Sequence, residues 1–411
     1  MLYLNTFLKR MQSGKTNFID FNNSEIAFRD QSNASLRETY QLFKVMNSRT
    51  MVKIGKHLVS FAFIFHLPVK AILRRTIYRH FVGGVSIEDC GETIARLAKR
   101  NVMSILDYAQ EGEESDEIFD FTCKEILRTV AYAHNNKNIP FSVFKITGVA
   151  RFGLLAKVSE NRSLTEEEAV EFQRVETRVD SIFKRGKELN VPILIDAEET
   201  WIQPVLDDMV MKQMARYNKE KAIVQNTYQM YRHDSIERIR AHHQMALKGG
   251  FKFGLKIVRG AYMEKERDRA AEKGYPSPIQ PDKQATDHDF DEIIRYFVAH
   301  YQTIDFMVAT HNEYSSLLLA NLIDEKGLAR DHRGIYFSQL YGMSDHITYN
   351  LAEQGYNVAK YLPYGEVGTM MPYLFRRAEE NSSVKGQTSR ELKLIQREIR
   401  RRKSTISLPK H

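Results

Sequence analysis

Hydrophobic and polar positions alternate in a regular rhythm from about residue 101 onward. Short apolar runs, rich in β-branched residues, are each followed by a stretch with the spacing of an amphipathic helix. Eight such runs are expected to form strands, at 102–107, 141–146, 192–196, 222–225, 253–259, 306–311, 334–340 and 357–361. Strands that alternate with helices are typical of parallel sheets, and eight repeats predict a closed (βα)8 barrel of the α/β class.

Local signals mark the ends of several helices. Thr165 and Glu168 form a capping box ahead of a periodic segment that runs to Asn190, which predicts one long helix. The pair Gly249-Gly250 predicts the end of the helix before the fifth strand. The proline-rich stretch 274–288 is expected to be a loop over one end of the barrel. No GxGxxG motif follows the first strand, which argues against an open dinucleotide-binding sheet.

The same rhythm divides the chain into three parts. Residues 1–95 lack it and are expected to form an N-terminal helical arm. Residues 96–381 carry the eight repeats and form the predicted barrel. Residues 382–411 begin with a polar turn and continue as a basic helix from about Glu391 to Lys403, followed by a tail.

The run from Tyr361 to Arg377 is the most informative stretch of the chain. It reads as a strand, a turn and a helix that opens near Thr369 with Pro372 in its first turn. Tyr373, Arg376 and Arg377 fall at i, i+3 and i+4, so a phenol and two guanidinium groups share one face of that helix. Paired guanidinium forks suit a carboxylate or a phosphate.

Further polar residues lie where the other strands end. The active sites of (βα)8 barrels form at the carboxyl ends of the strands, so these side chains are candidates for function. They are Lys145, Asp196, Gln225, Arg259, Tyr262, Thr310, His311, Asn312 and Tyr361, with Lys256 inside the fifth strand in phase with Val258. The predicted mouth holds at least four cations and few acids, which indicates an anionic ligand.

The residues alone leave the chemistry open. The first strand carries no HxH motif and His242 and His243 are adjacent, so we expect no metal site. Lys145 or Lys256 could form a Schiff base, as in a class I aldolase-type barrel that acts on an anionic small molecule. A flavin site and a phosphate site fit the same strand ends.

Charge and cysteine content narrow the cellular setting. The net charge is +8, and between Leu36 and His80 nine Lys and Arg residues face only Glu38, beside many apolar residues. These stretches match no helix-turn-helix or zinc-finger spacing, so we expect no nucleic-acid partner. They fit a membrane surface, with a helix packed on the main domain as the alternative. Cys90 and Cys123 are the two cysteines and form no CxxC, which fits a reducing compartment.

Seven ordered segments on the expected strands closely resemble the proline dehydrogenase family, of the monofunctional, eukaryotic type. They are FKITGVARFG, LIDAEET, AIVQNTYQ, LKIVRGAYMEKER, ATHN, QLYGM and YLPYGEVGTMMPYLFRRAEEN. The resemblance extends from about residue 80 to 400. It implies a distorted (βα)8 barrel whose final helix lies over the barrel mouth.

The resemblance also implies a function. The family binds FAD, oxidises L-proline to Δ1-pyrroline-5-carboxylate in proline catabolism, and passes electrons to a membrane quinone. This implies a cytoplasmic protein with peripheral contact to the inner membrane, or a mitochondrial protein in a eukaryote.

Matching motifs carry the family's residue roles onto this chain. Lys145, Tyr361, Tyr373, Arg376 and Arg377 would contact proline. Asp196 would lie beside the substrate and pair with the arginine helix, and Asp196 and Lys256 would act in catalysis. The flavin would be lined by Ala197, Gln225, Lys256, Arg259, Gly260, Ala261, Tyr262, Thr310, His311, Asn312 and Leu340. Many bacterial members carry arginine where this chain has Lys256, so a fork donor becomes a point donor here.

Overall fold

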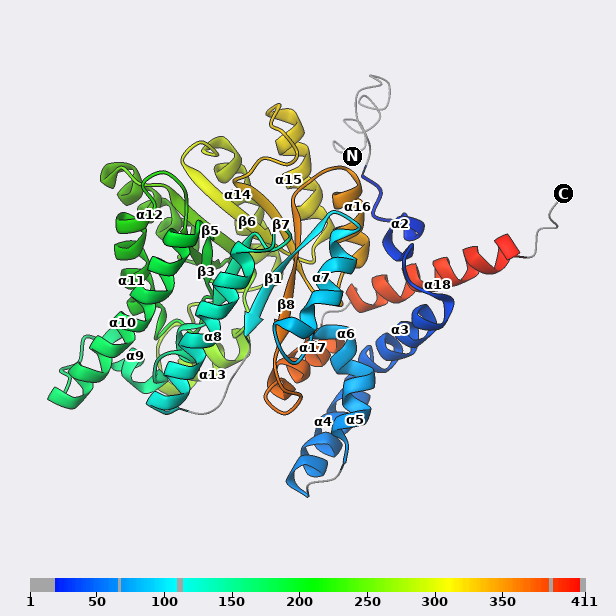
Figure 1. Cartoon of the computed structure of the whole chain (residues 1–411), viewed down its shortest axis with the longest axis horizontal. Coiled ribbons are helices and arrows are strands. Elements are labelled where there is room, and N and C mark those ends of the chain that lie inside the picture. The colour runs from blue at the N-terminus through cyan, green and yellow to red at the C-terminus, as the bar shows by residue number, and fades with distance from the viewer. Residues whose placement is uncertain (1–18, 66–67, 109–113, 384–386, 407–411) are drawn as a thin grey trace.

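The computed structural model describes residues 19–65, 68–108, 114–383 and 387–406. Eight parallel strands pair in chain order and close into a barrel, with β1 hydrogen-bonded to β8 (Figure 1). The strands are β1 (Val102–Tyr108), β2 (Phe141–Phe144), β3 (Ile193–Ile195), β4 (Val224–Gln229), β5 (Phe253–Val258), β6 (Ile304–Ala309), β7 (Ile335–Leu340) and β8 (Val358–Tyr364). The predicted (βα)8 barrel is confirmed.

Several strand ends differ from the prediction, and two strands, β4 and β8, matter for the site. β4 begins two residues later than expected and continues to Gln229, so Gln225 lies near its amino end. The prediction stopped too early because polar residues follow Gln225, yet these are buried, and Asn226 donates to Asp207 of an outer helix. β8 continues to Tyr364, so Tyr361 is an interior residue of that strand.

Helices between the strands cover the outside of the barrel. They are α8 (Asp116–His134), α9 (Phe152–Ser159), α10 (Glu166–Leu189), α11 (Gln203–Tyr217), α12 (Ser235–Gly249), α13 (Met263–Lys273), α14 (Lys283–Ala299), α15 (Glu313–Glu325) and α16 (Asp345–Glu353), with a short 3-10 turn η3 (Ile146–Gly148). The capping box of Thr165 and Glu168 is confirmed. Gly250 ends α12 with φ of 63°. The expected loop 274–288 is too long, because Asp282 caps α14 and the chain is helical from Lys283.

Inward-pointing side chains fill the barrel. Met103, Ile105 and Tyr361 pack there with residues of the other strands. Because side chains alternate along a strand, the next inward position of β1 after Ile105 is Asp107. Polar residues therefore replace apolar ones toward the carboxyl ends of the strands.

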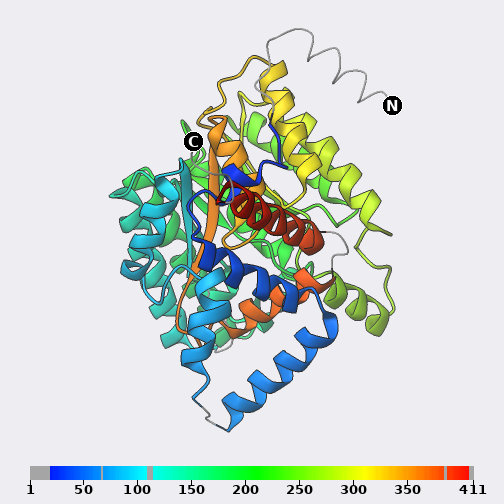
Figure 2. The ribbon, with the colours of Figure 1, turned by 90° about the vertical axis from the view of Figure 1, so that its right-hand side faces the viewer.

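The N-terminal arm is helical and packs beside the barrel (Figure 2). Its elements are α2 (Ser24–Phe28), α3 (Asn33–Met46), α4 (Arg49–Ile64), α5 (Lys70–Leu73), the π-helical turn η1 (Arg74–Tyr78), α6 (Arg79–Phe81), the 3-10 turn η2 (Glu88–Cys90) and α7 (Gly91–Ala98). The expected boundary at residue 95 falls inside α7, and the division into three domains stays a prediction. No helix among these described residues is long and apolar enough to cross a membrane.

Two helices follow β8. α17 (Met371–Ser383) begins two residues later than expected, with Pro372 in its first turn. It packs against α3 and α4 of the arm through an apolar cluster that includes Met46, Leu73 and Leu374. α18 (Gln387–Ile406) is the predicted basic helix, longer at both ends, and it packs against α2 and α3. The arm therefore supports both helices that follow the barrel.

Candidate active site

Four of the candidate residues meet at the centre of the barrel mouth. Asp196 accepts hydrogen bonds from Lys145 and Tyr361 on its Oδ2, at 2.8 and 2.6 Å, and from Lys256 on its Oδ1, at 2.5 Å. The Lys256 ammonium also lies 5.0 Å from the centre of the Tyr361 ring. Each carboxylate oxygen of Asp196 thus has at least one donor, and the expected pairing of Asp196 with the arginine helix stays a prediction.

Burial and the ion pairs set the charge of this cluster. Burial favours the neutral acid, but Lys145 and Lys256 hold the pKa of Asp196 well below its ordinary value. Burial likewise disfavours the Lys145 ammonium, but the carboxylates of Asp196 and Asp107 raise its pKa well above the ordinary value. Lys145 is therefore a charged, paired ammonium. A Schiff-base lysine needs the opposite, a lowered pKa, so the aldolase-type alternative finds no support at Lys145.

α17 brings an aromatic and cationic surface to the same mouth. The Arg377 guanidinium lies 4.8 Å from the centre of the Tyr373 ring, and both residues are buried. Arg377 also donates to Glu380 at 2.5 Å. Arg376 is half-buried, and its charge lowers the pKa of the Tyr262 phenol, although burial raises that pKa overall. The helix thus faces β5 and the Lys145 side of the barrel.

Several polar atoms at this mouth are buried and have no hydrogen-bond partner among the described residues. They are Oδ1 of Asp107, Oγ1 of Thr227, Oη of Tyr373 and Nε of Arg377. Thr227 is in register with Lys256, so both side chains point to the same side of the sheet. Because buried polar groups are nearly always hydrogen-bonded, four such atoms around one opening indicate a site for a polar ligand.

A second group of candidates forms a wall across β5 and β6. Arg259 donates to Thr310 at 2.6 Å and to Ser315 at 3.0 Å, and its guanidinium lies over the Phe290 ring. Gly260 has φ of 139°, and a Cβ there would lie 2.5 Å from the Tyr231 ring, so only glycine fits. Asn312 caps α15 by accepting from Ser315 N. These contacts fix the backbone of the wall.

Gln229 is a functional candidate that the sequence analysis missed. It ends β4, is buried, donates to the Glu198 carbonyl and accepts from Ala261 N at 3.0 Å. Gln225 instead donates to the Ala222 carbonyl near the amino end of the strand. We therefore move the expected cofactor contact from Gln225 to Gln229. The sequence analysis missed Gln229 because the polar residues in the middle of β4 led the prediction to end the strand too early.

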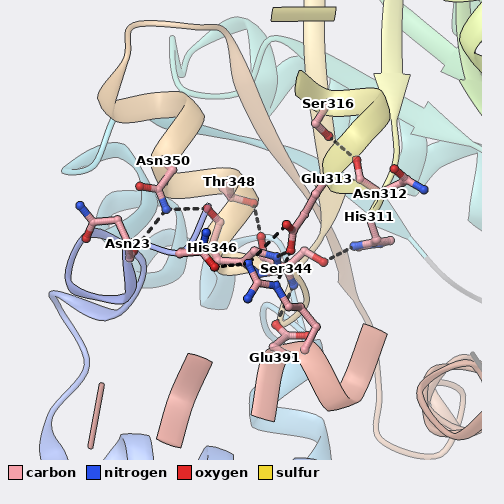
Figure 3. Close-up of polar contacts among 12 residues, drawn as sticks. Asn23, His311, Asn312, Glu313, Ser316, Ser344, His346, Thr348, Asn350 and Glu391 are labelled. Atoms are coloured by element: carbon pink, nitrogen blue, oxygen red, sulfur yellow. Dashed lines mark hydrogen bonds and ion pairs between the residues drawn. The ribbon is translucent and has the colours of Figure 1, made fainter. Parts of the chain in front are cut away.

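His311 is fastened to α18 through Ser344. His311 Nδ1 and Ser344 Oγ share a hydrogen bond of 3.0 Å, and Glu391 Oε1 accepts from Ser344 N at 2.8 Å (Figure 3). Burial, with the nearby Lys360 and Arg377 charges, lowers the pKa of His311 to about 3, so the ring is neutral. The basic C-terminal helix thus contacts the wall that carries His311.

A second polar link joins α15, α16 and α18. Glu313 of α15 accepts from His346 at 3.0 Å (Figure 3) and from Arg390 of α18 at 2.8 Å. Burial opposes ionisation, but these two hydrogen bonds lower the pKa of Glu313 to about 2. α18 is therefore held by two polar contacts beside the end of β6.

The remaining candidates lie around these groups. Ala197 follows Asp196 and is half-buried, and Leu340 ends β7 at the edge of the interior cluster. Among the residues described, no group of three or more His, Cys, Asp or Glu side chains is arranged to hold a metal ion. Fold and site together define a (βα)8 barrel whose mouth suits a small anionic ligand.

Comparisons with known proteins give the family. The family model described as Proline dehydrogenase matches residues 90–390. Proline dehydrogenase 2, mitochondrial, of Arabidopsis thaliana is 32% identical over 383 residues, covering 81% of this chain and 79% of the relative. The chain therefore belongs to the proline dehydrogenase family, and that prediction is confirmed.

Other relatives show the breadth of the similarity. Proline dehydrogenase 1, mitochondrial, of Homo sapiens is 40% identical over 248 residues, covering 59% of this chain and 41% of the relative. Carbapenem antibiotics biosynthesis protein CarD of Pectobacterium carotovorum subsp. carotovorum is 34% identical over 323 residues, covering 78% of this chain and 83% of the relative. This chain thus spans less than half of the human relative.

A solved structure supports the fold. Proline utilization A from Bdellovibrio bacteriovorus, inactivated by N-propargylglycine, superposes with a TM-score of 0.70 at 19% identity. The match covers 93% of this chain and 41% of that chain. Because the identity is this low, the likeness concerns the barrel architecture alone.

Proposed function

We propose that this protein oxidises L-proline to Δ1-pyrroline-5-carboxylate with bound FAD and passes the electrons to a membrane quinone. The observation that carries the proposal is the Lys145–Asp196–Lys256–Tyr361 cluster at the barrel mouth. Two lysines share Asp196 there, and Lys145 also lies 4.0 Å from Asp107 Oδ2. Membership of the proline dehydrogenase family supplies the class of reaction.

The substrate carboxylate would bind between the cluster and α17. Arg376, Arg377 and Lys145 are charged donors, and Arg377 keeps an unpaired Nε among the described contacts. Charge-assisted hydrogen bonds to a carboxylate would fix the ring and turn binding energy into orientation. Tyr361 and Tyr373 would pack against the apolar edges of proline.

The residues at the mouth fit a flavin. Orphaned donors and acceptors surround the opening, and Lys256 and Arg259 are cations that could bind an anionic group. The residues that would hold it are Ala197, Gln229, Lys256, Arg259, Gly260, Ala261, Tyr262, Thr310, His311, Asn312 and Leu340. When bound, FAD would supply the acceptor for the hydride that leaves proline. Lys256 would favour the negative charge of the reduced cofactor.

The outer face of α4 would provide the membrane contact. One side of the helix packs on α17 through Val59 and Phe63. Its other side exposes apolar residues that continue toward α5, namely Met51, Ile54, Leu58, Phe61, Ile64, Phe65 and Ile72. Figure 1 shows α4 and α5 projecting from the barrel beyond α17.

Exposed cations surround this apolar face. Lys53, Lys70, Arg74, Arg75 and Arg79 are all exposed. Apolar side chains flanked by cations suit an anionic bilayer surface, where a quinone would be available. The expected segment 36–80 thus packs on α17 with one side and exposes the other. Its membrane role stays a proposal.

The direct test is product formation by the purified chain. L-Proline and a soluble quinone analogue should yield Δ1-pyrroline-5-carboxylate, trapped by condensation with an aromatic amino-aldehyde, and the reduced quinone in equal amount. D-Proline should give neither. A chain that carries FAD but yields no trapped product from L-proline would contradict the proposal.

A further inference from the structure

Asp107 is an acid at the barrel mouth that none of the expected roles includes. It lies at the carboxyl end of β1, two residues beyond Ile105, whose side chain fills the barrel interior. By the alternation of side chains along a strand, the Asp107 carboxylate points inward, toward the mouth. The residue is only 2% exposed.

Asp107 and Asp196 differ in how their oxygens are used. Both oxygens of Asp196 accept hydrogen bonds from Lys145, Lys256 or Tyr361. Oδ2 of Asp107 lies 4.0 Å from Lys145 Nζ, while its Oδ1 has no hydrogen-bond partner among the described residues. Each oxygen of Asp196 is therefore already engaged, whereas Asp107 keeps one oxygen without a partner among the described residues.

Charged and phenolic groups from several elements surround Asp107, yet its Oδ1 accepts no hydrogen bond from the described residues. Those that act on it or sense its charge are Lys145, Asp196, Lys256, Tyr361, Tyr364 and Tyr373, from β2, β3, β5, β8 and α17. Burial, together with the Asp196 charge, raises the pKa of Asp107, although Lys145 and Lys256 oppose this. Asp107 therefore takes up a proton more readily than Asp196 does.

We propose that Asp107 pairs with the secondary ammonium of the substrate and accepts its proton. The inference rests on the proposed function. An amino-acid substrate brings a cation as well as a carboxylate, and each oxygen of Asp196 already accepts a hydrogen bond. Asp107 Oδ1 is a buried carboxylate oxygen at this mouth that has no hydrogen-bond partner among the described residues.

The proton balance of the oxidation requires such an acceptor. The N–H bond of the ammonium breaks, its electron pair stays on nitrogen, and the proton forms an O–H bond on Asp107. The freed pair forms the C=N bond as hydride leaves the neighbouring carbon for the oxidant, a flavin. Lys145 cannot accept this proton, because its pKa is raised and it is already charged.

The test compares two ligands that differ only at the ammonium. L-Proline and cyclopentanecarboxylate share the ring and the carboxylate, but only proline carries the cation. Binding is measured by anaerobic titration of protein whose FAD has been reduced beforehand, so that L-proline is not consumed, with D-proline as the non-substrate amino acid. In Asp107→Asn we expect both proline isomers to bind at least about tenfold more weakly, because a buried charge pair is lost. Cyclopentanecarboxylate should bind as well as before or better.

Ser104→Ala is the matched control. Ser104 lies on the same strand, is buried, and also has an oxygen without a hydrogen-bond partner among the described residues, but it is an odd number of residues from Asp107 and so points to the other side of β1. It should bind both ligands like the wild type. If Asp107→Asn weakens both ligands alike, or neither, the proposal is overturned.

A measurement on the unmodified protein covers the case in which Asp107→Asn does not fold. The ratio of proline to cyclopentanecarboxylate affinity should rise with pH as Asp107 loses its proton, and a ratio that is constant from about pH 5 to pH 9 would overturn the proposal. Failure of the proposed function looks different, because the wild type would then bind proline without oxidising it.

Discussion

The ammonium of Lys145 lies 2.8 Å from Oδ2 of Asp196 at the mouth of the barrel. Lys256 holds the other oxygen of the same carboxylate at 2.5 Å. This arrangement places two cations side by side at the barrel mouth, where their repulsion is offset by one shared acid. Asp107 lies 4.0 Å from the Lys145 ammonium as a second acid beside this pair.

Removal of the shared acid should disrupt the cluster. In Asp196→Asn the two buried ammonium groups lose their counter-charge, and we expect a loss of about 3–5 kcal/mol in the free energy of unfolding. Proline oxidation should fall below detection. Urea unfolding and kcat/KM for L-proline check both effects. Asp208→Asn on the exposed side of α11 is the control, and it should match the wild type.

Arg376 and Tyr361 should affect substrate choice differently. Arg376→Met removes a carboxylate contact worth about 1.5–3 kcal/mol, so kcat/KM for L-proline and trans-4-hydroxy-L-proline should fall by the same factor. Tyr361→Ser opens space beside the substrate ring and should reduce the preference for L-proline over trans-4-hydroxy-L-proline. The shape of a pocket alone can favour one of two such substrates by only about a hundredfold. A changed ratio in Arg376→Met, with an unchanged ratio in Tyr361→Ser, would reverse these assignments.

The contact between α18 and α16 should make stability depend on pH. Burial, with the Asp345 charge nearby, raises the pKa of Glu391 to about 8 in the folded chain, from an ordinary value of 4.5. Its contribution to stability is full below the ordinary value and is lost as pH rises through about 8. Glu391→Gln cannot ionise, so relative to the wild type it should become more stable between pH 5 and pH 9.

Thermal unfolding of both proteins across this pH range measures the difference. Gln keeps the acceptor oxygen for Ser344 N, so the contact itself survives the change. Glu391→Ala removes that acceptor and should destabilise the protein at every pH. A constant difference between Glu391→Gln and the wild type would contradict the raised pKa.

A charge on the outer face of α4 should weaken membrane binding but leave the oxidation of proline unchanged. Leu58 is 64% exposed there, and Leu58→Glu should weaken binding to anionic vesicles about tenfold or more. Turnover with a quinone embedded in vesicles should fall, while turnover with a soluble acceptor stays unchanged. Phe121→Glu on α8 is the control, since Phe121 is also exposed, at 54%, but lies on another helix. Equal vesicle binding by both variants and the wild type would contradict this role for α4.

Much of the architecture could be predicted from the sequence. Each strand of the barrel is buried on both faces, so it reads as a short apolar run, and the intervening helices carry clear amphipathic spacing. The α10 capping box and the Gly250 cap are local signals and were placed correctly. The predicted boundaries of β4 were wrong because Asn226 and Thr227 are polar residues inside a buried strand. The Asn226 amide donates a hydrogen bond to Asp207 of α11, on the outside of the barrel.

The arrangement within the site was harder to foresee. Strand-end position identified Lys145 and Asp196, but it could not show that Asp196 pairs with two lysines and a phenol. Asp107 was detectable, since it follows Met103 and Ile105 in phase on the first strand. The contact of Glu391 with Ser344 joins residues 47 positions apart and carries no local signal.

We propose that this barrel holds FAD and that L-proline reduces it. The direct measurement is the visible absorbance of the purified protein, loaded with FAD, during anaerobic titration with L-proline. We expect the oxidised flavin band to bleach in proportion to added L-proline and to stay unchanged with D-proline. A protein that fails to bind FAD, or a flavin band that L-proline leaves unbleached, would contradict the account.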